Sequence, residues 1–217
     1  NLSGPENTYK IAMIGKMGWA SFTGGYNRAI RAPNLSELFA TNQIALYNGD
    51  DGCAGVVDAD PDTFSPIYTQ AQCALTGMTA AQYGNTTESP AGQYNQFIGG
   101  NQNITPEQAD TWTFGFDFAP IEGLAVGIDY YDITIKNQIG TLGAQFILDS
   151  CIESGGNAGL CSKIQRNPAN GNLWQGEVGQ IINTVDNFGE TSTSGIDLNA
   201  NYTWDWLDGR CMASFVG

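Results

Sequence analysis

Large apolar residues alternate with small or polar ones on both sides of a short break in the stretch from Ala109 to Lys136. The apolar positions are Trp112, Phe114, Phe116, Phe118, Leu124, Val126, Ile128 and Tyr130. Successive side chains of a β-strand point to opposite faces, so each arm has one apolar and one polar face. The break, Ala119 to Gly123, contains Pro120, and Pro and Gly favour turns. The pattern predicts a β-hairpin whose apolar face suits either a packed sheet or lipid.

Two further segments repeat this pattern. Gly195 to Trp206 has six alternating apolar positions, which predict a strand of about 11 residues, long enough to cross a bilayer at the tilt of a β-barrel. Leu207 to Arg210 then predicts a turn, and a last strand begins at Cys211. A weaker alternation from Tyr9 to Ile30 predicts another hairpin, with its turn at Gly15 to Gly18. The chain therefore contains about six predicted strands.

The apolar positions change from even to odd numbers after Tyr130, because Ile133 and Ile135 continue the pattern. A β-bulge near Tyr131-Asp132 would produce this shift, and so would the exit of the strand from a membrane at that point. The paired tyrosines fit an aromatic girdle at a membrane interface or a cross-strand packing pair.

Two long polar segments, residues 40–105 and 137–179, separate the predicted strands. A loop of that length is unusual in a compact soluble domain, whereas outer-membrane barrels combine long extracellular loops with short periplasmic turns. The second segment contains Thr141 to Gly155, for which we expect a short helix with Phe146 and Ile147 packed inward. The contrast between long loops and a five-residue turn favours a membrane barrel.

Composition removes several functional classes. The formal net charge is −14, with 8 Lys and Arg residues and no His. A chain this acidic does not neutralise a row of phosphates, so nucleic acid is not an expected partner. Histidine-based catalysis and histidine metal ligation are excluded, and no run of about 18 apolar residues predicts a transmembrane helix. No signal peptide is visible at the start, which indicates a mature or internal segment.

Four of the five cysteines lie in the two long segments and pair by proximity as Cys53 with Cys73 and Cys151 with Cys161. Each disulfide would stabilise the fold by about 3 kcal/mol by restricting the unfolded chain. A metal site would need closer pairs such as C-x-x-C, which are absent. Disulfides indicate an oxidising compartment. Cys211 is left over, as a small buried or lipid-facing residue.

The sequence offers few chemical sites. Asp58, Asp60 and Asp62 have the spacing that opens a Ca²⁺ loop, but Thr63 and Thr69 stand where such a loop needs Gly and Glu. We interpret these three residues mainly as a solvated acidic loop and keep them as a weak Ca²⁺ candidate. No cofactor is expected. No serine has a His to activate it, so an enzyme is not expected.

Two other sets of residues are expected to have structural rather than chemical roles. The carboxylates on the polar strand faces are expected to line a wet lumen; they are Asp117, Asp129, Asp197 and Asp205. The aromatic residues of the long segments would pack within their loops more often than they would contact a ligand; they are Tyr47, Tyr68, Tyr83, Tyr94, Phe97 and Trp174.

Two motifs resemble those of TonB-dependent outer-membrane receptors. The first, Tyr26 to Phe39, is similar to Y-x-R-A-x-R-A-P-N-x-x-E-L-F, and the second, Asn101 to Trp112, is similar to N-x-x-L-x-P-E-x-A-x-x-[WY]. Ile104 stands where Leu is usual, and Thr105 replaces a common Lys. The motif residues are Arg28, Arg31, Ala32, Pro33, Asn34, Glu37, Leu38, Phe39, Pro106, Glu107 and Trp112.

The resemblance implies an all-β fold: an antiparallel transmembrane β-barrel segment of about six strands, from a larger, 22-stranded barrel with disulfide-stapled extracellular loops. Residues 1–217 would form part of the barrel domain, and the plug domain is not within this chain. The whole protein would import a scarce nutrient (a siderophore, cobalamin, a saccharide or a peptide) across the outer membrane of a Gram-negative bacterium. Its partners would be the lipid bilayer, the nutrient, and the TonB complex through the plug region.

Two alternatives remain open. A secreted, disulfide-stapled β-sandwich that acts as a binding or adhesion module would bury the Trp112 to Phe118 face against a second sheet. A small passive porin is the other, although a strand count of about six is low for a closed barrel.

Overall fold

The computed structural model describes residues 4–56 and 65–217. The chain forms two compact units, each described here by itself. The sheet unit comprises Asn1–Pro33, Thr105–Ile139 and Asn187–Gly217. The loop unit comprises Asn34–Ile104 and Gly140–Asp186. The predicted strands build the first unit, and the two long polar segments build the second.

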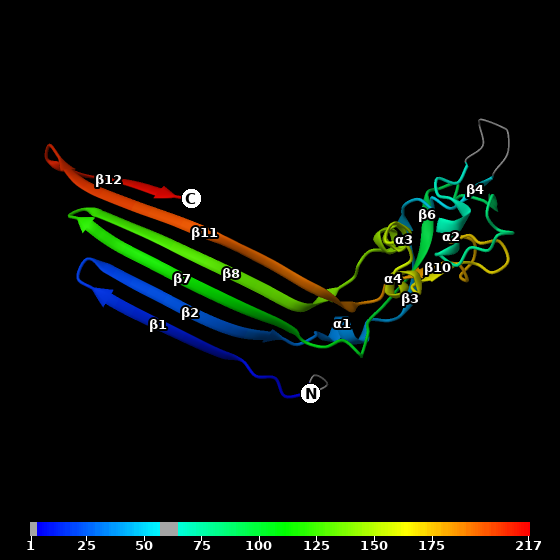
Figure 1. Ribbon diagram of the computed structural model, residues 1–217, viewed down its shortest axis with the longest axis horizontal. Coiled ribbons are helices and arrows are strands. Elements are labelled where there is room, and N and C mark those ends of the chain that lie inside the picture. Colours follow the sequence, from blue (N-terminus) through cyan, green and yellow to red (C-terminus); the bar gives the residue numbers. More distant parts are fainter. Residues whose placement is uncertain (1–3, 57–64) are drawn as a thin grey trace. The chain divides into compact units, whose positions relative to one another are not determined.

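The sheet unit is one six-stranded sheet in the order β1-β2-β7-β8-β11-β12 (Figure 1). Its strands are β1 (Tyr9–Met17), β2 (Ala20–Arg31), β7 (Glu107–Ile121), β8 (Leu124–Gly140), β11 (Asp186–Trp206) and β12 (Gly209–Val216). Pairing is antiparallel between β1 and β2, β2 and β7, β7 and β8, and β11 and β12. The strand count and the antiparallel arrangement agree with the sequence-based prediction.

The hairpin turns differ in detail from the prediction. The first turn lies at Gly18-Trp19 rather than at Gly15 to Gly18, because β1 continues to Met17 and pairs it with Ala20. In the central hairpin β7 extends through Pro120 to Ile121, and the ladder has a register shift between Phe118 and Ile121. Proline cannot donate a ladder hydrogen bond, so an irregularity at this position is the expected consequence.

The predicted β-bulge near Tyr131-Asp132 is absent from the ladder between β7 and β8. Tyr130, Tyr131 and Asp132 pair one to one with Phe114, Thr113 and Trp112. The strand continues without interruption to Gly140, so the apolar positions change from one face to the other along a regular strand. β11 is likewise longer than predicted, with 21 residues from Asp186 to Trp206.

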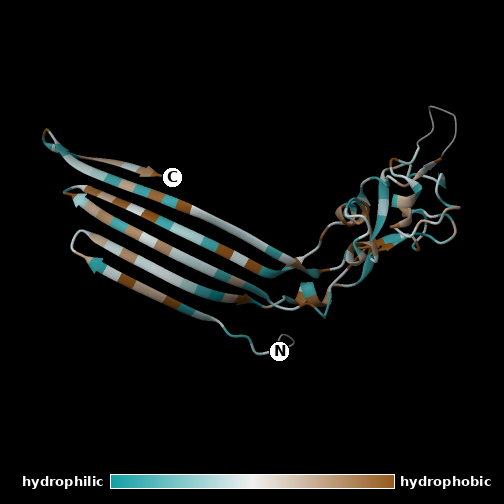
Figure 2. Cartoon of the chain, in the orientation of Figure 1, coloured by the Kyte–Doolittle hydropathy of each residue, from teal (hydrophilic) through white to brown (hydrophobic). Residues whose placement is uncertain are grey.

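The sheet has one apolar and one polar face, and hydrophobic positions alternate with hydrophilic ones along its strands (Figure 2). The apolar face remains accessible: the exposed fractions of Trp112, Phe114 and Ile196 are 48%, 54% and 62%. A β-sandwich would bury these side chains. The exposed face therefore contradicts the sandwich alternative.

The loop unit is folded, whereas the prediction treated its segments as long loops. A four-stranded sheet, in the order β3-β6-β10-β9, combines strands from both segments, and a second sheet pairs β4 with β5. The strands are β3 (Gln43–Asn48), β4 (Gly55–Val56), β5 (Asn85–Thr86), β6 (Gln93–Ile98), β9 (Ile164–Gln165) and β10 (Gln180–Ile182). The helices are α1 (Leu35–Phe39), α2 (Gln70–Ala74), α3 (Ala144–Glu153) and α4 (Ala158–Cys161).

Two small cores hold the loop unit together. The larger packs α3 against the four-stranded sheet through Ile147, Leu148, Tyr94 and Ile181, and the smaller surrounds Cys53 and Cys73. The predicted helix is therefore present, with Ile147 buried. Phe146 does not pack inward as predicted, because its exposed fraction is 53%.

Both predicted disulfides are present, Cys53–Cys73 and Cys151–Cys161. Cys211 is free and half-buried, and it pairs with Trp204 across β11 and β12. Among the described helices, none has the length and apolar character needed to span a membrane.

Candidate functional site

The two sequence motifs lie on neighbouring strands. β2 carries the start of the first motif and β7 the end of the second, and the register pairs Tyr26 with Trp112, Arg28 with Asp110 and Arg31 with Glu107. Residues more than 70 positions apart in the sequence are thus direct cross-strand neighbours. This pairing places the two motifs side by side in the sheet.

Ion pairs and hydrogen bonds connect the paired motif residues. Arg28 Nε donates to Asp110 Oδ1 at 2.8 Å, and Tyr26 Oη donates to the same oxygen at 2.6 Å. Arg31 donates from both Nε and Nη2 to the Glu107 carboxylate, at 2.6 and 2.9 Å. Bidentate pairs of this kind fix strand register as well as adding energy. Sequence reasoning missed Asp110, which occupies an unspecified position of the second motif, two residues before Trp112.

The Glu107 carboxylate also reaches a third strand, because the backbone N–H of Ile139 donates to its Oε1 at 2.7 Å. Glu107 therefore joins β2, β7 and the end of β8. Pro106 immediately precedes β7, where a residue without an N–H is tolerated.

The rest of the first motif forms a capped helical turn. Asn34 caps α1, since its side chain accepts from the N–H of Glu37 at 2.9 Å, and the Glu37 carboxylate accepts from the N–H of Asn34 at 2.8 Å. Ala32 and Pro33 lie between β2 and this cap. Leu38 is buried, whereas Phe39 is half-exposed.

Pairs of tyrosine and tryptophan rings lie toward both ends of the apolar face, and phenylalanine rings lie between them. The ring centroids of Tyr26 and Trp112 lie 4.5 Å apart, and those of Tyr202 and Trp204 lie 5.4 Å apart near the β11–β12 turn. Between them lie aromatic and aliphatic residues such as Phe116, which packs on Phe22 at 4.7 Å. Arg28, Asp110 and other charged residues follow beyond Trp112. This sequence of rings, apolar band and rings is typical of a barrel wall.

Glycines on the polar face make room for larger neighbours. A Cβ on Gly127 would meet Asp117 and Asn199, and one on Gly115 would meet Thr23 and Asp129. The sheet thereby accommodates carboxylates and amides on this face without spreading its strands. This arrangement agrees with the predicted placement of Asp117 and Asp129 on a polar surface.

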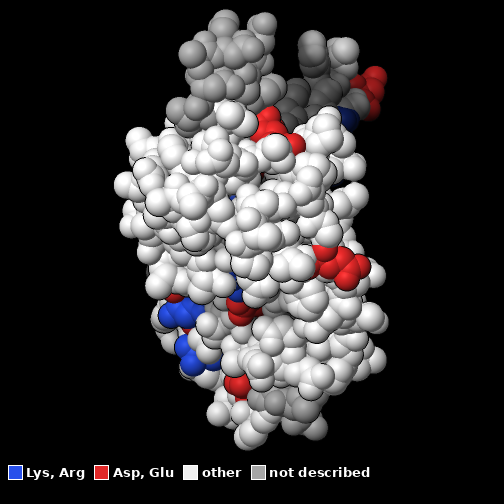
Figure 3. Space-filling model, turned by 90° about the vertical axis from the view of Figure 1, so that its right-hand side faces the viewer, with Lys and Arg blue, Asp and Glu red and all other residues white. Residues whose placement is uncertain are grey.

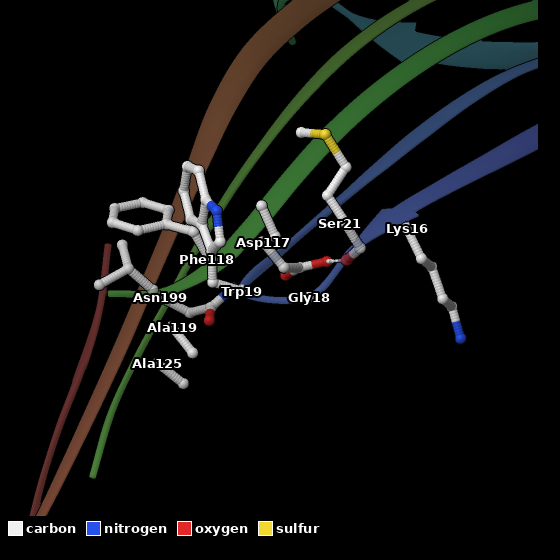
Figure 4. Close-up of a pocket in the computed structure, with 12 residues that line it drawn as sticks. Lys16, Gly18, Trp19, Ser21, Asp117, Phe118, Ala119, Ala125 and Asn199 are labelled. Carbon is white, nitrogen blue, oxygen red and sulfur yellow. Dashed lines mark hydrogen bonds between the residues drawn. The ribbon is translucent and has the colours of Figure 1, made fainter. Parts of the chain in front are cut away.

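An open cavity of about 430 Å³ lies on the sheet near the turn of the first hairpin (Figure 4). Ser21 Oγ donates to Asp117 Oδ2 at 3.3 Å inside it, and the Lys16 side chain points away from this pair (Figure 4). Ala119 and Ala125 supply small neighbours. The polar side chains that line the cavity are this hydroxyl–carboxylate pair, Lys16 and Asn199.

In the loop unit a buried ion pair joins distant segments. Arg166 Nη1 lies 2.6 Å from Asp51 Oδ2, and the exposed fractions of the two side chains are 2% and 1%. Arg166 also donates to Thr76 Oγ1 at 2.7 Å and to the carbonyl of Gly171 at 2.9 Å. No sequence pattern indicated this network, because its members come from separate parts of both long segments.

The loop unit is acidic, although few of its charges are grouped. By sequence it contains eleven Asp and Glu residues and two basic residues, a formal charge of −9. Both basic residues are paired, Arg166 with Asp51 and Lys163 with Asp186 at 2.9 Å. The face shown in Figure 3 is mostly uncharged, with small separate acidic and basic areas. Burial, assisted by the nearby Asp50 and Asp51, raises the pKa of Glu88.

The other candidate residues belong to the loop unit. Asp58, Asp60 and Asp62 lie outside the described residues. Within the described part of the chain, no group of three or more potential acidic or cysteine ligands is close enough to hold a metal. Of the loop aromatics, Tyr94 is buried, Tyr47 and Trp174 pack against the larger core, and Tyr68 and Tyr83 pack against the smaller one. Phe97 is half-buried on β6.

Comparisons with known proteins identify the family. The profile of the family described as "TonB dependent receptor-like, beta-barrel" matches residues 17–215. The siderophore receptor PirA from Acinetobacter baumannii is similar in structure, with a TM-score of 0.51 and 14% identity over 96% of this chain and 22% of that chain. A variant of the ferric enterobactin receptor PfeA from Pseudomonas aeruginosa, solved with enterobactin, gives a TM-score of 0.52 and 15% identity over 99% and 22%.

Identities this low show the fold alone, and the chain spans only 22% of the length of each of these two receptors. The comparison with curated proteins found no match. The family profile nevertheless covers nearly the whole chain, from the last residue of β1 into β12. The chain therefore belongs to the TonB-dependent receptor β-barrel family.

Proposed function

We propose that this chain is part of the barrel wall of an outer-membrane receptor that imports a scarce nutrient with energy supplied by TonB. The six-stranded sheet would supply six neighbouring strands of a larger, 22-stranded barrel. The loop unit would lie on the extracellular side, and the short turns Gly18-Trp19, Glu122-Gly123 and Leu207-Asp208 on the periplasmic side. A plug domain, supplied by another part of the receptor, would occupy the lumen and contact TonB.

The apolar band on the sheet is the observation that carries this proposal. On β11 it runs from Ile196 to Trp206. At about 3.3 Å per residue and a tilt of about 40°, this stretch spans about 25 Å along the barrel axis, the height of the lipid-facing band of outer-membrane barrels. The aromatic rings at both ends of the band suit the two membrane interfaces. The polar face, with Asp117 and Asn199, suits a wet lumen filled by a plug.

This geometry also bears on the passive-porin alternative. A passive porin would close its barrel around an open, water-filled channel. The family match favours a large plugged receptor. The structural relatives named above are receptors for siderophores, but their low identity leaves the nutrient of this receptor open.

The experiment is accessibility labelling in intact cells that produce the full receptor. In a Cys211→Ser background, Glu177→Cys places a thiol on the exposed surface of the loop unit, and Asp208→Cys places one in the β11–β12 turn. A membrane-impermeant maleimide should label Glu177→Cys in intact cells and Asp208→Cys only after the outer membrane is opened. Equal labelling of both thiols in intact cells would contradict the proposed placement in the membrane.

A further inference from the structure

A second cavity, of about 690 Å³, lies within the loop unit beside its four-stranded sheet. This volume is in the range of small-molecule sites, about 300–1,000 Å³. Side chains that combine hydrogen-bond donors and acceptors line much of it, namely Thr41, Gln43, Gln96, Thr141 and Asn183. All of its lining residues belong to the loop unit, and none of them is a disulfide cysteine.

The strand register explains why amides collect there. Gln43 pairs with Ile98 on β3 and β6, and Gln96 pairs with Ile181 on β10. Directly opposite residues share a face of a sheet, and residues two apart return to it, so Asn183 follows Ile181 onto this same face. Further along that face Tyr94 and Ile181 belong to the larger core. The same surface thus passes from an apolar core under α3 to an amide-lined cavity.

Hydrogen bonds hold two of the amides in fixed orientations. Asn183 Nδ2 donates to Gln96 Oε1 at 2.9 Å, and Asn183 Oδ1 accepts from the N–H of Gly143 at 3.0 Å. Gln96 Nε2 donates to the carbonyl of Leu46 at 3.4 Å. A primary amide has two N–H groups and two lone pairs, so each side chain keeps donor and acceptor capacity for a ligand. The fixed orientation of these amides lowers the entropy cost of binding a ligand.

The wall beside these amides depends on one close approach. Gly100 N donates to the carbonyl of Ala40 at 3.0 Å, and a Cβ on Gly100 would lie 2.7 Å from backbone atoms of Leu38 and Phe39. Glycine at this position lets the end of α1 lie directly against the end of β6. Ser36 and Glu37 of α1, which line the cavity, are therefore held beside β6 by backbone contacts.

The charges around the cavity disfavour an anionic ligand. Its lining contains one carboxylate, Glu37, and no basic residue. The only two basic residues in the sequence of the loop unit, Lys163 and Arg166, are already in ion pairs. A ligand with several negative charges would find no counter-charge here and would be repelled by the formal charge of the unit.

We infer that this cavity binds an uncharged, polyhydroxylated ligand of the saccharide class; the inference rests on the proposed receptor function. A sugar hydroxyl donates and accepts hydrogen bonds at once, and the oriented amides of Gln96 and Asn183 match that need. The carboxylate of Glu37 accepts hydrogen bonds from hydroxyl groups, and Ile98 and Val185 offer apolar surface to the C–H faces of a sugar ring.

The test uses the full receptor purified in detergent, with calorimetric titration of three probes. The first is a panel of neutral linear oligosaccharides (maltohexaose, cellohexaose and xylohexaose), the second an uncharged ferric trihydroxamate, and the third an anionic ferric tris-catecholate. The variants are Gln43→Ala and Gln96→Ala. The matched control is Gln93→Ala, which lies on β6 but on the opposite face from Gln96.

We expect at least one oligosaccharide to bind and each cavity variant to weaken it about tenfold, the loss of one or two hydrogen bonds. The Gln93→Ala variant should bind like the unmodified receptor. Both disulfides and resistance of the loop unit to protease verify that each variant is folded. Gln43→Ala, on the exposed edge strand, keeps the test valid if Gln96→Ala fails this check.

Three results would overturn the inference: no oligosaccharide binds, either iron chelate binds more tightly than every oligosaccharide, or the cavity variants bind as the unmodified receptor does. Import of an iron chelate by an outer-membrane receptor whose cavity variants are unaffected would overturn this inference alone. Absence of the unmodified receptor from the outer membrane would instead count against the proposed function.

Discussion

At the scale of single residues, Arg166 connects distant parts of the loop unit. Its guanidinium contacts the remote residues Asp51 and Thr76 and the nearby carbonyl of Gly171, so that it joins two remote segments to its own. Because both charged groups are almost fully buried, each is stabilised by the other in place of water. Removal of one partner leaves the second without compensation, which costs more than the pair contributes.

We predict that Arg166→Met destabilises the loop unit by about 3–5 kcal/mol. The measurement is urea-dependent pulse proteolysis of the loop unit in the full receptor. Lys163→Met is the control, because its ion pair with Asp186 is more exposed and should contribute less than about 1 kcal/mol. Similar losses for the two variants would show that burial of the Arg166 pair has no special weight.

Glu88 gives the loop unit a dependence on pH. Its pKa is raised above the ordinary value of 4.5 by burial and by the neighbouring Asp50 and Asp51. A raised carboxyl pKa means that the folded unit favours the protonated form. The stability it contributes is present below the ordinary pKa and is lost as the pH rises through the raised value.

We therefore predict that Glu88→Gln raises the melting temperature of the loop unit at pH 7 and that this gain disappears below about pH 4. Thermal unfolding of the full receptor, followed at several pH values, measures it. Glu177→Gln, which removes an exposed carboxylate of the same unit, controls for the change in net charge. A gain that grows toward low pH would have the wrong sign and would contradict the assignment to Glu88.

At the scale of elements, the two faces of β7 lie in different environments. Phe116 lies on the apolar face in contact with the ring of Phe22, and its neighbour Asp117 lies on the polar face with Ser21. Adjacent positions of one strand thus meet opposite environments. In the proposed barrel the first faces lipid and the second faces the lumen.

We predict that Phe116→Arg destabilises the folded receptor by about 2–4 kcal/mol, the cost of a cation near the middle of the lipid face. Asp117→Arg, one residue away, should cost less because its side chain remains in a polar environment. Urea-dependent folding into lipid vesicles, read from the heat-modifiable migration of the receptor, measures both. Equal costs at the two positions would contradict the assignment of lipid to the apolar face.

At the scale of the whole molecule, the sheet has two unpaired edges, β1 and β12, at the ends of its strand order. Exposed edges and an accessible apolar face both favour association with other chains or with lipid. A barrel removes such edges by closing on itself. The rest of the receptor would supply the strands that pair with β1 and β12.

We predict that the isolated 217-residue chain does not form a soluble monomer without detergent. Size-exclusion chromatography with light scattering, in plain buffer and in detergent, tests this. A monomer that unfolds cooperatively in plain buffer would revive the secreted-module alternative and would count against the barrel fragment.

The sequence determined the strands of the sheet unit, their faces and the family. Alternation from Trp112 to Tyr130 and from Ile196 to Trp206 has a period of two residues that only a strand satisfies, and proximity correctly paired the cysteines. These features are local, since each depends on residues within about 20 positions of one another. The capped turn at Asn34 is local in the same sense.

The tertiary structure decided what depends on distant residues. The sequence left residues 40–105 and 137–179 as loops, because the strands within them are short and their pairing joins segments far apart, as Gln96 and Ile181 do. The Arg166–Asp51 pair, the Arg28–Asp110 pair and the amide-lined cavity arise the same way. The periodicity of a segment does not show which distant residues it will contact. The strands of the sheet unit could therefore be predicted from the sequence, and the fold of the loop unit could not.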